Sequence, residues 1–399
     1  MKLAKLSLAA IVVAGLTTGS FAADTLVDAF KNGQVSGQLK SSYFTRDNGA
    51  SNEDIINVGV TLGYVSDSFM GFKLGATFQS SHAPFADGAV GVDGAKNRFK
   101  GDMYGSGAQL SEMYLQYSAG KTVAKVGRQF LARTPLMASS GSRFIRTAME
   151  GVTVYNTDLP DTTLFAAYLD KHQMRTDGTG GIADFLDNSA AVSAVGKDGA
   201  YSVMAMNKSV PGLTLTAQYG DMIDKFTIYY LEAAYAGKAS NFTYGLAAQY
   251  SGTNYDAPTG NFQDTSYYGL KASLGMGAFS TYVAYSQVDD DGHAQDSIII
   301  TDPIFTANEI SSNEYFRSEK AYAIDVNYKI NANAKIGGRF SNLSFDTGVA
   351  VDRDIMAYYG SYAFDGALKG FEVEATYETV NYDTGSDTNE LRFKANYKF

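Results

Sequence analysis

Apolar and polar residues alternate along most of the chain beyond about residue 33. In the C-terminal segment 391–399 every second residue is apolar, and the residues between them are polar or basic. The apolar positions are Leu391, Phe393, Ala395, Tyr397 and Phe399. Successive side chains of a strand point to opposite faces, so this segment predicts a strand with one apolar and one polar face. Segment 371–378 repeats the pattern.

Segments of this kind recur about 18 times, each roughly ten residues long, as in outer-membrane β-barrels. The predicted strands are 35–45, 55–65, 69–80, 110–119, 122–130, 151–159, 162–171, 200–207, 213–219, 226–235, 242–250, 265–274, 278–288, 320–328, 334–341, 354–364, 371–379 and 388–399.

The connections between these strands alternate in length. Those after even-numbered strands are short, and most of those after odd-numbered strands are longer. The longer ones are 82–109, 131–150, 172–199, 251–264 and 289–319. A soluble β-sandwich also alternates, but it has no reason to sort its loops in this way. We therefore predict an all-β fold, a transmembrane antiparallel barrel of about 18 strands with both termini in the periplasm.

Composition agrees with an exported barrel. The chain has no Cys and no Trp, but 28 Tyr and 24 Phe, which can form the aromatic belts of a membrane protein. Lys2 and Lys5, the apolar run 6–16 and the small residues at 20–22 predict a signal peptide, residues 1–22. The domain prediction is then a barrel at 23–399, with a short periplasmic segment 23–33 that can form a helical turn.

One basic stretch stands out in a chain with 42 acidic and 32 basic residues. Segment 125–154 combines arginines with a run of small residues, 138–142. A barrel of 16–18 strands encloses a channel too wide for side chains to fill, so a long loop has room to fold inward. We predict that 131–150 is this constriction loop. The predicted constriction residues are Arg128, Arg133, Arg143, Arg146 and, at the start of the next strand, Glu150. The alternative is that these arginines only anchor the loop to wall carboxylates.

The predicted pore wall carries both signs of charge. Its residues by strand alternation are Lys125, Glu112, Glu372, Glu374 and Arg392. Much of the acidic surplus falls in predicted extracellular loops, notably 289–314, which includes Asp296 and Asp302. The arginines suit anionic groups, whereas the acidic loops enrich cations at the mouth. We expect weak selectivity, slightly in favour of cations.

Other chemistry is weakly indicated. The acidic segments 289–292 and 47–53 could bind a divalent cation, but neither has EF-hand spacing, and a solvated acidic loop is favoured. We therefore assign no cofactor and no metal. His82 beside Ser80 and Ser81 is the only nearby combination for nucleophilic catalysis, so an outer-membrane enzyme is disfavoured. An adhesin or structural barrel is the other alternative. The acidic balance gives no reason to expect a nucleic-acid partner.

The chain resembles the OprD-like outer-membrane porins, including the campylobacter-type major outer-membrane proteins. The resemblance rests on the opening ADTLVDAFKNGQVSGQLKSSYFTRDNG, on VGRQFLARTPLMASSGSRFIRTAMEGVTVYNTDLPDTTL, on the short turns and on the terminal Phe399. It implies a passive channel for ions and small hydrophilic solutes in the outer membrane of a Gram-negative bacterium. It also implies a non-enzymatic protein that contacts outer-membrane lipid and forms a homotrimer.

Overall fold

The computed structural model describes residues 23–50, 52–84, 106–177, 181–186, 199–346 and 348–399. The predicted signal peptide, residues 1–22, lies outside this part of the chain. The first element of the described part is a short helix, α2 (Leu26–Lys31), where a helical turn was expected. Thr25 caps it, because its hydroxyl accepts the backbone N–H of Asp28 at 3.1 Å. No helix among the described residues is long and apolar enough to cross a membrane.

Strands make up nearly all of the remaining regular secondary structure. They are β1 (Gln34–Asp47), β2 (Asn52–Val65), β3 (Phe72–Ser81), β4 (Gly107–Ala119), β5 (Thr122–Gln129), β6 (Ala148–Asn156), β7 (Thr162–Gln173), β8 (Phe185–Leu186), β9 (Ala200–Asn207), β10 (Leu213–Met222), β11 (Phe226–Ala239), β12 (Phe242–Tyr255), β13 (Thr265–Met276), β14 (Phe279–Val288), β15 (Lys320–Lys329), β16 (Ala334–Ser344), β17 (Arg353–Ala363), β18 (Phe371–Tyr382) and β19 (Thr388–Lys398). A 3-10 helix, Gly366–Leu368, lies between β17 and β18.

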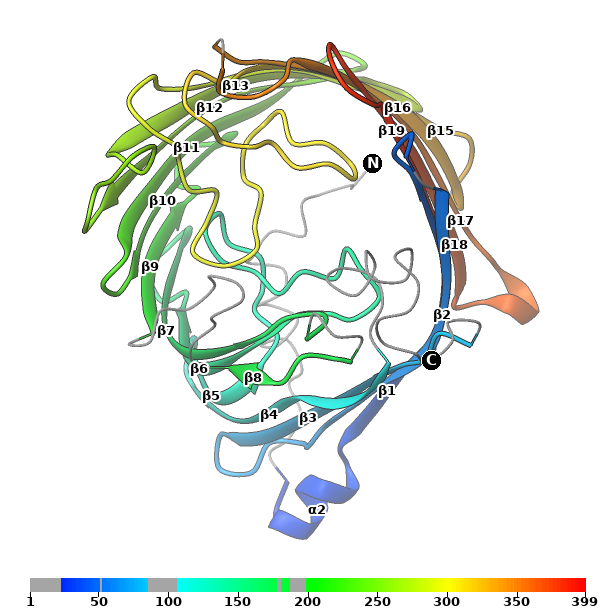
Figure 1. Ribbon diagram of the computed structural model, residues 1–399. Coiled ribbons are helices and arrows are strands. Elements are labelled where there is room, and N and C mark those ends of the chain that lie inside the picture. The colour runs from blue at the N-terminus through cyan, green and yellow to red at the C-terminus, as the bar shows by residue number, and fades with distance from the viewer. Residues whose placement is uncertain (1–22, 51, 85–105, 178–180, 187–198, 347) are drawn as a thin grey trace.

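The strands close into a barrel (Figure 1). β1 pairs antiparallel with β2 on one side and with β19 on the other, which leaves no open edge there. The two-residue β8 lies outside the ring, because β7 pairs directly with β9. Eighteen of the strands in the described part of the chain therefore form the barrel, as predicted, and all their pairings are antiparallel.

The two ends of the barrel differ. At one end the connections are short, such as 120–121 between β4 and β5, 240–241 between β11 and β12, and 277–278 between β13 and β14. Long connections, including 130–147 and 289–319, leave from the other end. We call these the short-turn end and the long-loop end. The short-turn end also carries α2 and the C-terminal Phe399.

The outward face is apolar. Leu231, Leu246 and Leu270 are 50%, 59% and 53% exposed although they occupy mid-strand positions. Outward tyrosines lie nearer the strand ends, for example Tyr235 and Tyr328, and form the aromatic belts of a membrane barrel.

The lumen face of β7, β9 and β11 breaks the alternation, because apolar residues point inward as well. They belong to a buried cluster inside the barrel, which also takes in residues from two long connections. We call this the lumen cluster. Its strand residues are Met149, Phe165, Ala167, Leu169, Ala200, Met204, Met222, Phe226, Ile228 and Tyr230. Apolar side chains facing a water-filled channel would be unfavourable, so these strands require a cover.

Candidate functional site

Two connections from the long-loop end fold into the lumen (Figure 1). The first inward loop, residues 130–147, joins β5 to β6. The second inward loop, residues 289–319, joins β14 to β15. The first was predicted as the constriction loop, with bounds 131–150; the structure begins β6 at Ala148, so Glu150 belongs to the wall. The second was predicted to be extracellular, and that prediction is wrong.

The early part of the first inward loop rests on the lumen cluster. Leu131, Leu136 and Met137 are 2% exposed or less and pack within it. The wall side chain of Gln218 also accepts the Leu136 backbone N–H at 3.0 Å and donates to the Thr134 hydroxyl at 3.0 Å. This half of the loop is therefore fixed by both apolar contact and hydrogen bonds.

The later part of the loop is held through its backbone. Lys40 of β1 donates to the Phe144 carbonyl, and Lys394 of β19 donates to the Ser142 carbonyl at 3.0 Å. Gln79 of β3 makes two bonds to Arg146, donating to its carbonyl at 2.9 Å and accepting its N–H at 3.0 Å. These bonds bring the loop against the wall opposite the lumen cluster.

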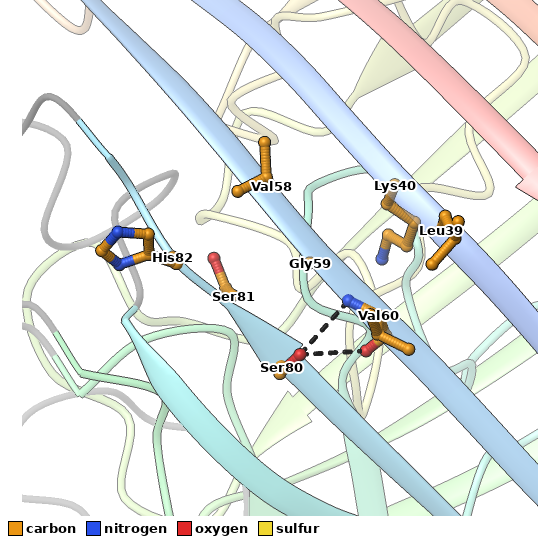
Figure 2. A pocket seen from close by; sticks show the side chains of 8 residues that line it. All are labelled: Leu39, Lys40, Val58, Gly59, Val60, Ser80, Ser81 and His82. Atoms are coloured by element: carbon orange, nitrogen blue, oxygen red, sulfur yellow. Dashed lines mark hydrogen bonds between the residues drawn. The ribbon is translucent and has the colours of Figure 1, made fainter.

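The tip of this loop meets the wall at Gly59 of β2. A Cβ at this glycine would lie 2.8 Å from the Phe144 ring and 2.1 Å from the Ser80 carbonyl oxygen. Figure 2 shows the small pocket around it, where the Ser80 hydroxyl bonds the backbone N–H and carbonyl of Val60 at 3.2 and 3.4 Å. Only glycine permits this close approach.

The two inward loops are joined to each other. Met137 and Ile299 form a parallel backbone bridge, and the Leu136 carbonyl accepts the N–H groups of Ile298 and Ile299 at 3.0 and 3.2 Å. Thr301 donates to the Pro135 carbonyl. Ile298 and Ile299 also enter the lumen cluster. The pair of loops is therefore one packed unit.

Charged wall residues hold the rest of the second inward loop. Glu378 of β18 accepts the N–H groups of Ile310 and Ser311 at 2.9 and 2.7 Å. Arg339 of β16 pairs with Glu309 of the loop at 2.8 Å. The first loop thus contacts the wall at β1, β3 and β19, and the second contacts it at β16 and β18.

Three of the predicted constriction residues lie on the first inward loop inside the barrel. Arg133 is exposed and donates to the Asp302 carbonyl at 3.0 Å. Arg143 is half-buried and close enough to Lys394 for the two charges to repel. The Arg146 guanidinium lies 4.4 Å from the centroid of the Phe130 ring, a cation–π contact. They are distributed along the loop rather than gathered at one point.

Arg128 and Glu150 lie on the barrel wall, and the prediction that Arg128 projects into the lumen is wrong. Arg128 pairs with Glu150 across β5 and β6, two positions from the pair Val126 and Val152. Both valines face outward, 52% and 40% exposed, so their alternation places Arg128 and Glu150 on the outward face too. There they form a salt bridge of 2.9 Å.

The predicted wall residues do face the lumen by their register. Lys125 lies over the Tyr114 ring at 4.3 Å, and Glu112 accepts from the Thr77 hydroxyl at 2.5 Å and the Phe130 N–H at 2.9 Å. Arg392 pairs with Glu390 at 2.5 Å. Glu374 lies beside Lys394, and Glu372 contacts Lys398 at 3.4 Å.

Cations follow one another along this side of the lumen. Lys125, Arg146, Lys40, Lys394 and Arg143 form a series in which neighbouring charges repel. We call it the basic strip. Lys40 and Lys394 bond carbonyl oxygens, which do not neutralise their charge.

Two carboxyl groups of the second inward loop are partly buried inside the barrel. Desolvation raises the pKa of Asp296 to about 7 and that of Asp302 to about 6. The negative charge of Asp302 adds to the shift of Asp296, whereas the Tyr315 hydroxyl, which donates to Asp302, and Arg133 oppose the shift of Asp302. These acids are therefore part of the constriction rather than of an outer mouth.

The structure adds no support for a metal site or for a catalytic Ser/His pair in the part of the chain that it describes. Among the described residues no three His, Asp or Glu side chains are grouped so that they could hold a metal ion. The Ser80 hydroxyl is engaged with the Val60 backbone, and Ser81 and His82 are successive residues of an extended segment, so they point to opposite faces. This arrangement does not favour a nucleophile–base pair.

The model of the OprD family of outer membrane porins matches residues 69–399. The chain belongs to this family. As an OprD porin, it forms a channel through which small solutes diffuse across a Gram-negative outer membrane. Comparison with curated protein sequences gave no match.

Solved OprD-type structures share the fold. Pseudomonas aeruginosa OccK3 (OpdO) superposes with a TM-score of 0.78 at 16% identity, covering 94% of this chain and 97% of that one. OccK8 (OprE) of the same organism gives 0.78 at 15%, covering 93% and 98%. P. aeruginosa OpdK with vanillate gives 0.77 at 16%, covering 93% and 99%.

The inward path of the second loop of this OprD porin was not predicted, although two features of the sequence indicate it. The run Ser297-Ile298-Ile299-Ile300-Thr301 is too apolar for a loop in free solvent. Strands β7 and β11 are apolar on both faces, which also indicates that something covers their lumen side.

We predict that Gly59→Ala loosens the tip of the first inward loop. The added methyl group clashes with the Ser80 carbonyl and displaces the Phe144 ring. Such overpacking typically destabilises a packed structure by about 1–3 kcal/mol. Single-channel recordings should show higher conductance and more open-channel noise than the parent. Gly63→Ala is the matched control on the same face of β2, because its neighbours are side-chain hydroxyls that can move. Equal traces from Gly59→Ala and the parent would contradict this anchor.

The second inward loop should loosen as pH rises. In the inward position Asp296 and Asp302 hold protons more tightly than in water, where their pKa is 3.8. The inward position is therefore most favoured below about pH 4 and loses this preference as pH passes 6 and 7. Current noise should be larger at pH 8 than at pH 5, and Asp296→Asn should remove most of the difference. Asp291→Asn, an exposed position of the same loop, is the control. Greater noise at pH 5 than at pH 8 would show the sign to be wrong.

Proposed function

We propose that this OprD porin is a weakly charge-selective channel narrowed by the two inward loops, in which the basic strip contacts the anionic groups of passing solutes. The support is the placement of Lys40, Arg143 and Lys394 along the first inward loop and the wall beside it. Guanidinium and ammonium groups bind carboxylates and phosphates through charge-assisted hydrogen bonds.

The opposite charge limits the net selectivity. Asp296 and Asp302 lie in the second inward loop, and exposed Asp289, Asp290 and Asp291 lie where it leaves β14. At 0.1 M salt the electrostatic field of an exposed charge extends about 10 Å before it is screened. In a narrow passage, both the acidic and the basic side chains therefore act on a passing ion. We expect slight cation selectivity overall, with anionic groups contacting the basic side.

Arg143→Ala and Arg146→Ala should each shift the reversal potential in a salt gradient further toward cation selectivity. A unit charge about 5 Å from an ion in water contributes somewhat under 1 kcal/mol, so the permeability ratio should change about two- to fourfold. Arg128→Ala is the matched control, because it removes the same charge from the outward face. If neither loop variant differs from this control, the arginines are anchors outside the current path. A parent channel with strong anion selectivity would refute the proposed balance.

Orientation and lineage are part of the proposal. We propose that the short-turn end and both termini face the periplasm, since short periplasmic turns and longer extracellular loops are typical of these barrels. We also propose that residues 1–22 are a signal peptide and that the protein belongs to the campylobacter-type group. The sequence of the first inward loop and the opening of the mature chain support this. Catalytic or purely adhesive roles have no comparable support.

We further propose a homotrimer, assembled through a shallow outward groove across β9–β12. Two cross-strand alanine pairs, Ala205 with Ala217 and Ala233 with Ala248, form its floor, and larger residues such as Leu215, Leu231 and Tyr250 line it as well. Ala233→Phe fills the groove and should convert cross-linked trimers to monomers, whereas Ala395→Phe, outward on β19, should not. Cross-linking of the parent that never exceeds one copy would reject the trimer and leave the channel proposal standing.

A further inference from the structure

The helix α2 lies outside the ring of strands at the short-turn end (Figure 1). It does not enter the lumen, and it contributes nothing to the constriction. Its position is nevertheless fixed by contacts with the barrel, so it is a built part of the fold.

Those contacts are made mostly by backbone atoms and by one outward tyrosine. The Tyr64 hydroxyl donates to the Phe30 carbonyl at 2.6 Å, and the two rings stack with centroids 6.5 Å apart. The Asp67 N–H donates to the Ala29 carbonyl at 2.9 Å. Ala29 is 1% exposed and faces the barrel. The rotation of the helix about its axis is thereby determined.

That rotation leaves apolar side chains on the outside. Leu26, Val27 and Phe30 are 57%, 60% and 47% exposed. At about 100° per residue they occupy one continuous arc of the helix, whereas Asp28 lies on the other side. A six-residue helix with three exposed large apolar residues is unfavourable in water.

The exposed arc continues the outward surface of the barrel. Tyr64 and Phe72 carry the membrane-facing surface to the short-turn end, and Met70 in the turn between β2 and β3 is 75% exposed. Val35, the second residue of β1, is 71% exposed. The helix therefore borders the belt of the barrel that lipid covers, at the level where amphipathic helices lie in a membrane interface.

We propose that α2 is an interfacial anchor, with Leu26, Val27 and Phe30 inserted among the phospholipids of the leaflet at the short-turn end. Asp24, Asp28 and Lys31 then remain at the headgroup level or in water. The anchor secures the start of β1, the strand that closes the barrel against β19.

The chain has no Cys and no Trp, so single reporters can be placed without background. Val27→Cys tests the exposed arc, and Asp24→Cys is the matched control at an exposed polar position just before the helix. Both are reconstituted in phospholipid nanodiscs, which leave the two leaflets open to solvent. A charged, membrane-impermeant thiol reagent should modify the Val27→Cys thiol at least about tenfold more slowly than the Asp24→Cys thiol.

A second reporter identifies what covers the helix. Leu26→Trp should lose most of its fluorescence in nanodiscs of phospholipid brominated near the top of the acyl chains, and acrylamide should quench it weakly. Channel conductance verifies that each variant has folded.

Equal thiol reactivity at the two positions overturns the anchor. Slow reaction without bromine quenching also overturns it, because protein rather than lipid then covers the helix. Both results leave the channel and its inward loops unaffected.

Discussion

The lumen cluster is the contact on which the constriction depends. A closed ring of 18 strands has no need of an internal core, since its apolar surface faces lipid and its lumen faces water. Here β7, β9 and β11 are apolar toward the lumen too, and that surface is covered by Leu136, Met137, Ile298 and Ile299 of the inward loops. Burial of these apolar side chains brings both inward loops to the same part of the barrel wall.

The charges of the pore follow from this placement. Because the first inward loop packs on the lumen cluster at one end and bonds Lys40 and Lys394 at the other, Arg143 and Arg146 lie beside wall lysines. Assembling like charges is unfavourable, and the hydrogen bonds to loop carbonyls offset part of that cost. The same lysines thus hold the loop and contribute to the field in the pore.

The barrel was predictable from the sequence because alternation, loop lengths and chain closure are local or repetitive signals. The C-terminal strand was placed within a residue, with Arg392 inward and Phe393 outward. The error at Arg128 was avoidable: Lys125 and Arg128 are an odd number of residues apart in one strand, so both could not face the lumen. The bonds from Gln79 to Arg146 or from Lys394 to Ser142 join residues far apart in the chain. No periodicity reveals such contacts, and neither the inward path of the second loop nor its contact with the first was foreseen.

The backbone bonds of the first inward loop have a consequence for how such channels diversify. Lys40, Lys394 and Gln79 recognise carbonyl and N–H groups at positions 142, 144 and 146, which every residue except proline can supply. The path of the loop is therefore largely uncoupled from the identity of the side chains at Ser142, Arg143 and Arg146. Substitutions at these positions should therefore leave the scaffold around the pore the same, so this short segment is the natural place to test a redesign of the channel for a different solute.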